Sequence, residues 1–208
     1  WYTVTGGSQN YVKKITAPYQ KSIQLGKPVQ KIRKEGKKVA LYFARGSKKT
    51  YDHVVLACHA DEALALLSDS TPKERKILGA FHYQHNMAYL HSDVSVMPKR
   101  KRCWASWVYR LEGSDDHSLS VTYWMNRLQN IDPSYPLFVT LNPAEPIASD
   151  SVFDTPCFTH PVFTRDAIEA QKSMPTIQGV RNIWFCGAYQ RYGFHEDGLL
   201  SAVKTCEV

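Results

Sequence analysis

Two short apolar runs constrain the fold most strongly: VVLA at residues 54–57 and NIWFCGA at residues 182–188. Each run is apolar at successive positions, so both faces of the strand are expected to be buried, which is typical of a central parallel strand. The two runs share this apolar pattern, yet they lie far apart in the chain. We therefore predict that the chain leaves one sheet, builds a second and returns, which gives two interleaved domains.

The first third of the chain indicates a short helix followed by strands. GGSQNYVKKITAPY predicts a helix that Ser8 caps and that reaches Tyr19. SIQLG, PVQKIRKEG and KVALYFARG alternate apolar and polar residues, and they end at Gly26, Gly36 and Gly46. This pattern predicts consecutive antiparallel strands joined by tight turns.

Between residues 81 and 142 the composition changes, and aromatic-rich runs appear: FHYQHNMAYLH, CWASWVY, LSVTYWMN and LFVTLN. These runs predict the longer strands of a second sheet. Helices are predicted in ADEALALL, in TPKERKILGAF with Thr71 as cap, in TRDAIEAQKSM and in DGLLSAVKTCEV. The fold class is therefore mixed α/β (α+β), with an inserted, mainly antiparallel sheet.

Composition excludes several classes. No apolar run approaches the length of a membrane span, and no signal peptide pattern opens the chain. Five cysteines are scattered without a CxxC pair, so neither a disulfide scaffold nor a zinc site is indicated, and no metal is expected. A reducing, cytoplasmic location fits this usage. Because the first residue is Trp, we expect a piece of a longer protein.

The net charge of +7 is unevenly distributed. Residues 1–104 hold 19 basic and 7 acidic residues, whereas residues 105–208 hold 7 and 12. The sharpest basic run is PKRKR, Pro98–Arg102, which could dock a phosphate-rich surface such as nucleic acid or anionic lipid. Its place between two predicted strand ends favours a solvated turn, and no nucleic-acid motif accompanies it.

The densest polar cluster, YGFHEDGL at residues 192–199, lies between the second apolar run and the last predicted helix. A strand that ends in Cys-Gly-Ala brings its backbone to the carboxyl edge of a sheet, where open α/β folds bind ligands. Gly193 and Gly198 allow close approach of a ligand to the backbone. The start of the following helix directs free N–H groups to the same place and favours an electron-rich group.

Several stretches resemble a known family: VVLACHADEALALL, LHSDVSVMPKRKRCWASW, TYWMNRLQ, LNP, HPVF and CGAYQRYGFHEDGLLSA. They are similar to FAD-dependent amine-oxidase-like proteins, which are predicted NAD(P)/FAD-binding oxidoreductases, and to the flavoprotein segment of some plant cyclopropane fatty acid synthases. The resemblance covers nearly the whole chain. It implies a glutathione-reductase-type FAD domain, here residues 1–80 and 161–208, with an inserted substrate domain at residues 81–160.

The resemblance also implies which residues lie near the cofactor. Backbone N–H groups from Glu196 through Asp197 and Gly198 to Leu199 are expected to face the pyrimidine end of the flavin ring. Gly187, Ala188 and Gly193 belong to the same cofactor-binding stretch, and Val29 is expected on the adenine side.

One part of the family pattern is missing. The family's front end carries a GxGxxG loop, whereas Gly6–Gly7 lacks both a preceding strand and a third glycine. The resemblance therefore implies a C-terminal fragment that holds the ring half of a flavin site and lacks the pyrophosphate half. We expect such a fragment to bind FAD weakly or not at all and to be inactive alone.

Each candidate functional residue also has a purely structural interpretation. His195 is a candidate proton relay, or it bonds its own loop. Glu196 and Asp197 contact the ribityl chain, or they are an acidic pair that the helix dipole favours. Cys58 and His59 resemble a nucleophile and base, but neighbours on a strand face opposite ways.

The aromatic region leaves similar choices open. His85 and His91 share a strand face and His82 does not, which disfavours a three-histidine metal site. Asn126 ends an aromatic strand and could face a cavity. Four aromatic residues wall an apolar tunnel or pack in a core: Trp104, Trp107, Tyr123 and Trp124.

The resemblance thus implies part of an FAD-dependent oxidoreductase whose substrate we expect to be a small, apolar, lipid-like molecule, with no nucleic-acid partner. The alternative is a non-catalytic binding domain derived from a flavoprotein.

Overall fold

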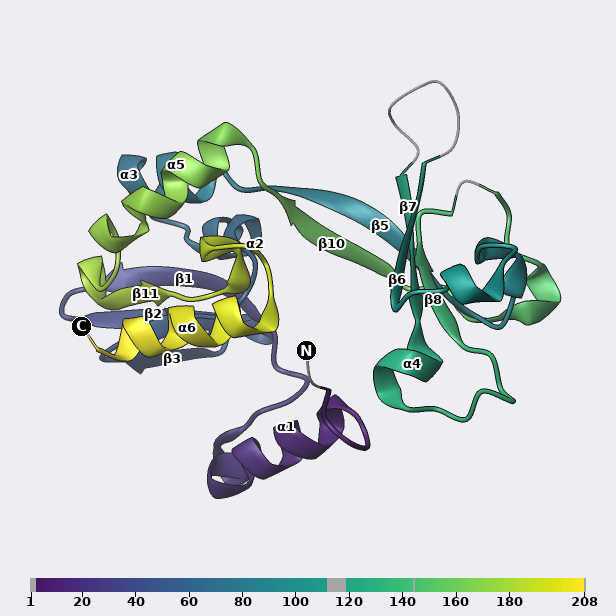
Figure 1. The fold of residues 1–208 in the computed structure, drawn as a ribbon. Coiled ribbons are helices and arrows are strands. Elements are labelled where there is room, and N and C mark those ends of the chain that lie inside the picture. The colour runs from purple at the N-terminus through teal and green to yellow at the C-terminus, as the bar shows by residue number, and fades with distance from the viewer. Residues whose placement is uncertain (1–2, 112–118, 144, 208) are drawn as a thin grey trace. The chain divides into compact units, whose positions relative to one another are not determined.

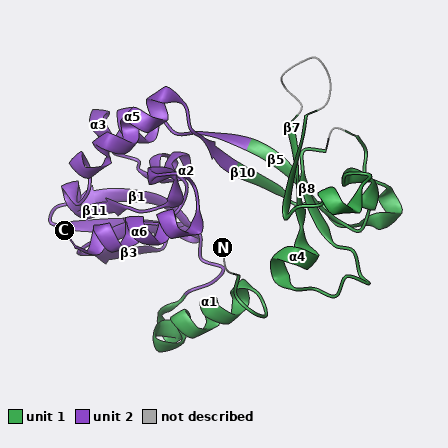
Figure 2. Ribbon diagram, in the orientation of Figure 1, with its two compact units in different colours: residues 1–23, 85–159 green, residues 24–84, 160–208 purple. Residues whose placement is uncertain are grey.

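The computed structural model describes residues 3–111, 119–143 and 145–207, and these divide into two compact units (Figures 1 and 2). Unit 1 comprises residues 1–23 and 85–159, and unit 2 comprises residues 24–84 and 160–208. The boundary falls inside two strands, β5 (His82–His91) and β10 (Cys157–Val162). Residues 1–23 group with unit 1, whereas the sequence analysis assigns them to the FAD-binding part.

Unit 2 begins with an antiparallel meander. Its strands are β1 (Val29–Glu35), β2 (Lys38–Phe43) and β3 (Lys48–Tyr51), and they pair in that order. The turn between β1 and β2 includes Gly36 at φ 57°, a conformation that glycine adopts without strain. The predicted hairpin of β1 and β2 is confirmed, whereas β3 was not predicted. SIQLG is not a strand, because residues 17–22 form a 3-10 helix and the chain then runs irregularly to β1.

The two apolar runs pair in parallel, as predicted. β4 (Val54–Leu56) lies beside β11 (Ile183–Phe185), in a different sheet from β5 and its neighbours. Leu56, Ile183 and Phe185 belong to the main hydrophobic core. The expectation that both faces are buried is wrong at Val55, which is 53% exposed, because its side chain lies on the face opposite the core residue Leu56.

Four helices complete unit 2: α2 (Ala60–Leu66), α3 (Pro72–Leu78), α5 (Arg165–Ser173) and α6 (His195–Cys206). α6 is attached to β11, since the Thr205 hydroxyl donates to the Phe185 carbonyl at 3.3 Å. The outer edge of β11 is closed by an amide side chain. Phe185 N–H donates to Gln178 Oε1 at 2.9 Å, and Gln178 Nε2 donates to the Phe185 carbonyl at 2.6 Å.

Unit 1 is built on a six-stranded sheet that β5 and β10 also enter. Its other strands are β6 (Trp107–Leu111), β7 (Leu119–Trp124), β8 (Phe138–Leu141) and β9 (Val152–Asp154), and its helices are α1 (Ser8–Thr16) and α4 (Met125–Gln129). The second sheet is therefore confirmed. The cap of α1 is Gly7 rather than Ser8, and the predicted strand LSVTYWMN ends at Trp124, where α4 begins.

The four aromatic residues of the predicted tunnel divide between the two faces of this sheet. Trp104 is half-buried and packs edge-on against Trp124 and Phe138, with ring centroids 5.1 and 5.9 Å apart, so it packs on one face. Trp107 and Tyr123 pair on the opposite face. None of the helices in the described ranges combines the length and the apolar character that a membrane crossing requires.

Candidate functional site

The candidate site is the loop from β11 to α6. Gly187 follows β11, and its N–H donates to Ser201 Oγ of α6 at 2.8 Å. A Cβ at Gly187 would lie 2.6 Å from the Tyr189 ring, so only glycine fits there. Ala188 begins a 3-10 turn, and its carbonyl accepts the N–H groups of Arg191 and Gly193, each at 3.1 Å.

Asp197 organises the second half of the loop. It is 6% exposed, and Oδ2 accepts the N–H groups of Tyr192 at 3.2 Å and Phe194 at 3.1 Å. Arg191 lies on the other carboxylate oxygen, with Nε 3.7 Å from Oδ1. The Asp197 side chain is thus held inside the loop, where its charge also stabilises the helix start.

A side chain from α5 fixes the loop from the other side. Gln171 Nε2 donates to the carbonyls of Tyr189 at 2.9 Å and Arg191 at 2.6 Å. No sequence signal indicated Gln171, because it lies in a different helix. Asp197 was identifiable, since an acid at the third helical position commonly caps the residue before the helix.

The outward side of the helix start is open. His195 and Glu196 are exposed, and as the first two helical residues their N–H groups have no acceptor within the helix. The N–H groups of Asp197 and Gly198 both donate to the Phe194 carbonyl, at 3.0 and 3.2 Å. The open amides are therefore at His195 and Glu196, so Glu196 is the residue that they share with the Glu196–Leu199 stretch expected from the resemblance.

Gly198 and Leu199 complete this surface. A Cβ built on Gly198 would meet only Ala188, at 3.8 Å or more, which is ordinary contact distance. Leu199 is mostly exposed. The fold therefore leaves room at residue 198 for a side chain, and the glycine there is not required by packing.

Val29 lies apart from this loop. It opens β1, in the meander rather than in the β4–β11 sheet, and packs against the core. The structure thus brings the predicted residues from Gly187 to Leu199 into one loop and helix start, and it leaves Val29 in another sheet.

Cys58 and His59 follow β4 and face different surroundings. Burial raises the pKa of the Cys58 thiol, so it is held as the weakly reactive neutral form. The His59 ring stacks on Tyr83 with centroids 4.4 Å apart. Burial raises the pKa of Tyr83 to about 12, and its hydroxyl accepts the Ala60 N–H at 2.8 Å. This arrangement closes the start of α2.

Two residues of unit 1 that the sequence analysis considered as functional candidates, Asn126 and His85, contact other residues of the protein. Asn126 is buried, and its amide bonds the backbone of Asp132, Tyr135 and Leu137 at 2.8–2.9 Å, so it holds a loop and does not face a cavity. Cys157 Sγ lies 3.7 Å from His85 Nδ1. Across the part of the chain that the structure describes, no three His, Cys, Asp or Glu side chains gather as metal ligands.

Comparison with known proteins confirms the resemblance to flavin enzymes. Residues 1–89 match the family described as flavin containing amine oxidoreductase. The fold matches a CLA-producing fatty acid isomerase from P. acnes with a TM-score of 0.64, at 13% identity, over 97% of this chain and 52% of that one. No curated protein sequence matches the chain significantly.

Two further solved structures agree with this class. A protein described as a protoporphyrinogen oxidase from Exiguobacterium sp. 255-15 matches with a TM-score of 0.66, at 12% identity, over 97% of this chain and 50% of that one. A reduced UDP-galactopyranose mutase matches with a TM-score of 0.51, at 12% identity, over 79% and 42%. The chain therefore has the mixed α/β fold of these enzymes and spans about half their length or less.

Proposed function

We propose that this chain carries the flavin-ring half of an FAD site, with the β11–α6 loop as the surface that meets the ring. The observation that carries the proposal is the open start of α6. Its first two N–H groups are exposed, and the glycine at residue 198 is not demanded by packing. Both features suit an electron-rich planar ring lying against the backbone. The family match, which covers residues 1–89, supports the choice of a flavin as the ligand.

Unit 2 would then be the remainder of a glutathione-reductase-type FAD domain, and unit 1 the substrate domain. The described residues fit the ring end of the cofactor. Gly187, Ala188 and Gly193 shape the loop, Asp197 and Gln171 hold it, and Glu196, Gly198 and Leu199 present the surface. Val29 would contribute on the adenine side from the meander.

A bound flavin supplies the redox chemistry by accepting a hydride from the substrate. The protein contributes positioning and electrostatics. The N–H groups of His195 and Glu196, together with the positive end of the α6 dipole, would favour negative charge on the ring's pyrimidine end. His195 is exposed beside them and is the candidate for moving a proton at its imidazole nitrogens.

The substrate proposal is an apolar, lipid-like molecule. Strand pairing aligns Trp107 with Tyr123, Tyr123 with Val139 and Val121 with Leu141 on one face of the unit 1 sheet. Alternate residues of a strand share a face, so this face presents aromatic and aliphatic side chains throughout. It therefore suits a hydrocarbon substrate. The P. acnes neighbour is described as acting on a fatty acid, which agrees with this choice.

Titration with two flavins tests the proposal. Lumiflavin carries the ring alone, whereas FAD adds a pyrophosphate and an adenosine. Because this sequence has no GxGxxG loop, we expect both flavins to bind weakly and with similar affinity, measured by quenching of flavin fluorescence, and AMP should not displace lumiflavin. Absence of lumiflavin binding would contradict the proposal, as would tight binding of FAD with displacement by AMP.

A further inference from the structure

The surface from residue 94 to residue 111 of unit 1 carries charges that the flavin proposal does not use, and it borders the sheet face proposed for the substrate, to which Tyr109 belongs. Its centre is a basic turn, Lys99–Arg102, whose four side chains are all exposed. The turn is held in place by Trp104, whose indole Nε1 donates to the Pro98 carbonyl at 2.8 Å. Because the half-buried Trp104 ring packs edge-on against Trp124 and Phe138, the basic turn is anchored to the sheet.

The four positive charges of the basic turn are not neutralised by the described part of the chain. Within those residues, no carboxylate lies at ion-pair distance from any of them. Lys101 instead lies over the Trp104 ring, with Nζ 5.7 Å from its centroid. Four adjacent cations held over one anchored turn form a concentrated positive patch, which attracts a polyanionic surface.

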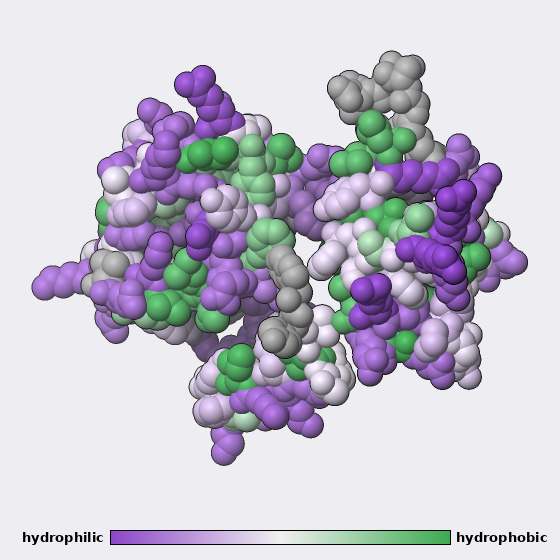
Figure 3. All heavy atoms as spheres, viewed as in Figure 1, coloured by the Kyte–Doolittle hydropathy of each residue, from purple (hydrophilic) through white to green (hydrophobic). Residues whose placement is uncertain are grey.

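Exposed apolar side chains adjoin this patch. A hollow of about 330 Å³ is lined by Lys99 together with Val96, Val108 and Tyr109, so the basic turn and strand β6 share one surface. Tyr109 is 68% exposed, and Leu111 on the same strand face is 62% exposed. Val94, before the turn, is 49% exposed. Figure 3 shows hydrophobic and hydrophilic residues adjoining on the visible surface of this unit.

We propose that this surface docks on an anionic lipid membrane, with the basic turn at the headgroups and Val94, Tyr109 and Leu111 inserted at the acyl boundary. Cations next to exposed apolar residues are the combination that interfacial binding uses. The exposed aliphatic side chains favour a lipid over a nucleic acid as the binding partner. Nucleic acids are bound by cations and by aromatic faces that stack on bases, and Val94 and Leu111 supply no such face.

This proposal is an alternative to the solvated turn that the sequence favours. The sequence showed the four charges and the flanking strand ends, which favoured that interpretation. It did not show that Trp104 anchors the turn or that Lys99 and Tyr109 line one hollow. The proposal does not depend on flavin binding, so the two can fail separately.

Vesicle sedimentation tests the proposal on the whole chain. We expect binding to phosphatidylcholine vesicles that contain phosphatidylserine, little binding to phosphatidylcholine alone, and loss of binding as salt rises. The test variant replaces the four basic residues of the turn with Ser. Each basic residue near the surface contributes about fivefold to partitioning, so four independent contributions multiply to about 600-fold, and we expect this variant to bind at least about 100-fold more weakly.

A matched variant removes the same charge elsewhere, at four exposed lysines: Lys13, Lys14, Lys21 and Lys27. It should keep most of the binding, whereas Tyr109→Ser with Leu111→Ser should weaken it with the charge unchanged. Circular dichroism checks that each variant is folded. The proposal is overturned by no vesicle binding at low salt, by equal loss in the two charge variants, or by single-stranded RNA binding without vesicle binding.

Discussion

Helices α3 and α6 begin with the same capping hydrogen bond from an acidic side chain, but the other N–H groups at the two helix starts have different partners. In each, the acid at the third helical position accepts the N–H of the residue before the helix: Glu74 Oε2 from Thr71 at 2.6 Å, and Asp197 Oδ2 from Phe194 at 3.1 Å. At α3, Thr71 Oγ1 also accepts the Glu74 N–H at 3.1 Å, and Pro72 has no N–H to satisfy. At α6, Phe194 offers no side-chain acceptor, and the first N–H groups stay open.

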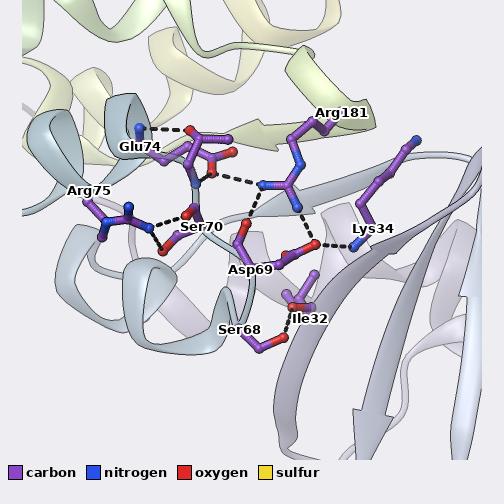
Figure 4. A network of polar contacts seen from close by, with 9 residues as sticks. Ile32, Lys34, Ser68, Asp69, Ser70, Glu74, Arg75 and Arg181 are labelled. Atoms are coloured by element: carbon purple, nitrogen blue, oxygen red, sulfur yellow. Dashed lines mark hydrogen bonds and ion pairs between the residues drawn. The ribbon is translucent and has the colours of Figure 1, made fainter.

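Figure 4 shows the polar contacts that hold Glu74 at the α3 start. Arg181, far along the chain, places Nη1 3.0 Å from Glu74 Oε2 and Nη2 2.6 Å from Asp69 Oδ2. Asp69 Oδ2 also accepts the Lys34 N–H at 3.1 Å. The difference teaches that this chain can seal a helix start with its own residues, and that the open start of α6 suits a ligand.

The largest expected effect comes from removing the Arg181 charge. Arg181→Gln keeps a long polar side chain but leaves Glu74, 1% exposed, as a buried carboxylate without its cation. We expect the free energy of unfolding to fall by about 3 kcal/mol, measured by urea denaturation. Arg75→Gln is the matched control, because Arg75 is exposed, bonds only Ser70 in the same network and should change stability by less than about 1 kcal/mol. Equal losses in the two variants would contradict the buried ion pair.

The next effect concerns the acid that organises α6. Asp197→Ala removes the acceptor for the N–H groups of Tyr192 and Phe194, so we expect a loss of about 2 kcal/mol. Lumiflavin binding should also be lost, because the loop is no longer held. Glu196→Ala is the matched control, since Glu196 is exposed and its loss should leave stability nearly unchanged. An Asp197→Ala protein that keeps its flavin affinity would show that the loop does not shape the site.

The closed start of α2 predicts a pH effect. The Tyr83 hydroxyl accepts the Ala60 N–H, and burial raises its pKa to about 12, above the ordinary value of 10. The folded state therefore keeps the proton after the unfolded state has released it. The stability from Tyr83 is fully present below pH 10 and is lost as the pH rises from about 10 to 12, by about 1 kcal/mol. Chemical denaturation across this range should show a smaller slope for Tyr83→Phe, and an unchanged slope would contradict the assignment.

A smaller effect would convert the open helix start into a closed one. Phe194→Ser supplies the cap oxygen that α3 has in Thr71 and removes an exposed aromatic ring. We expect a gain of about 0.5–1 kcal/mol from the new cap and weaker lumiflavin binding, as the helix start is then partly satisfied from within. Thermal unfolding and flavin titration of one preparation measure both changes. A less stable variant would show that Phe194 contributes packing instead of an opening.

Local patterns allowed much of this fold to be predicted. Gly36 marks the turn between β1 and β2, and Thr71 with Pro72 marks the start of α3, because turns and caps depend on neighbouring residues. The parallel pairing of β4 and β11 followed from their apolar runs. SIQLG was mistaken for a strand, since alternation over five residues does not ensure that a neighbouring strand is available.

Contacts between distant residues could not be predicted. Arg181 and Glu74 are separated by 107 positions, and no periodicity relates them. Likewise, Gln171 holds the β11–α6 loop from another helix, and Trp104 anchors the basic turn by its packing. For the candidate site, the sequence identified the loop. Only the structure shows that the Asp197 carboxylate is occupied by hydrogen bonds within the loop, whereas the N–H groups of His195 and Glu196 are open.

The central claim is that residue 198 is a glycine to admit a ligand and not to satisfy the fold. Gly198→Ala tests it most directly, because the added Cβ would meet only Ala188 at 3.8 Å or more, and alanine favours helix by up to about 1 kcal/mol. We predict an unchanged or raised melting temperature together with a fall of at least about tenfold in lumiflavin affinity, which corresponds to about 1.4 kcal/mol. His195→Ala should leave both quantities nearly unchanged. Unaltered lumiflavin affinity in Gly198→Ala, or a lowered melting temperature, would contradict the account.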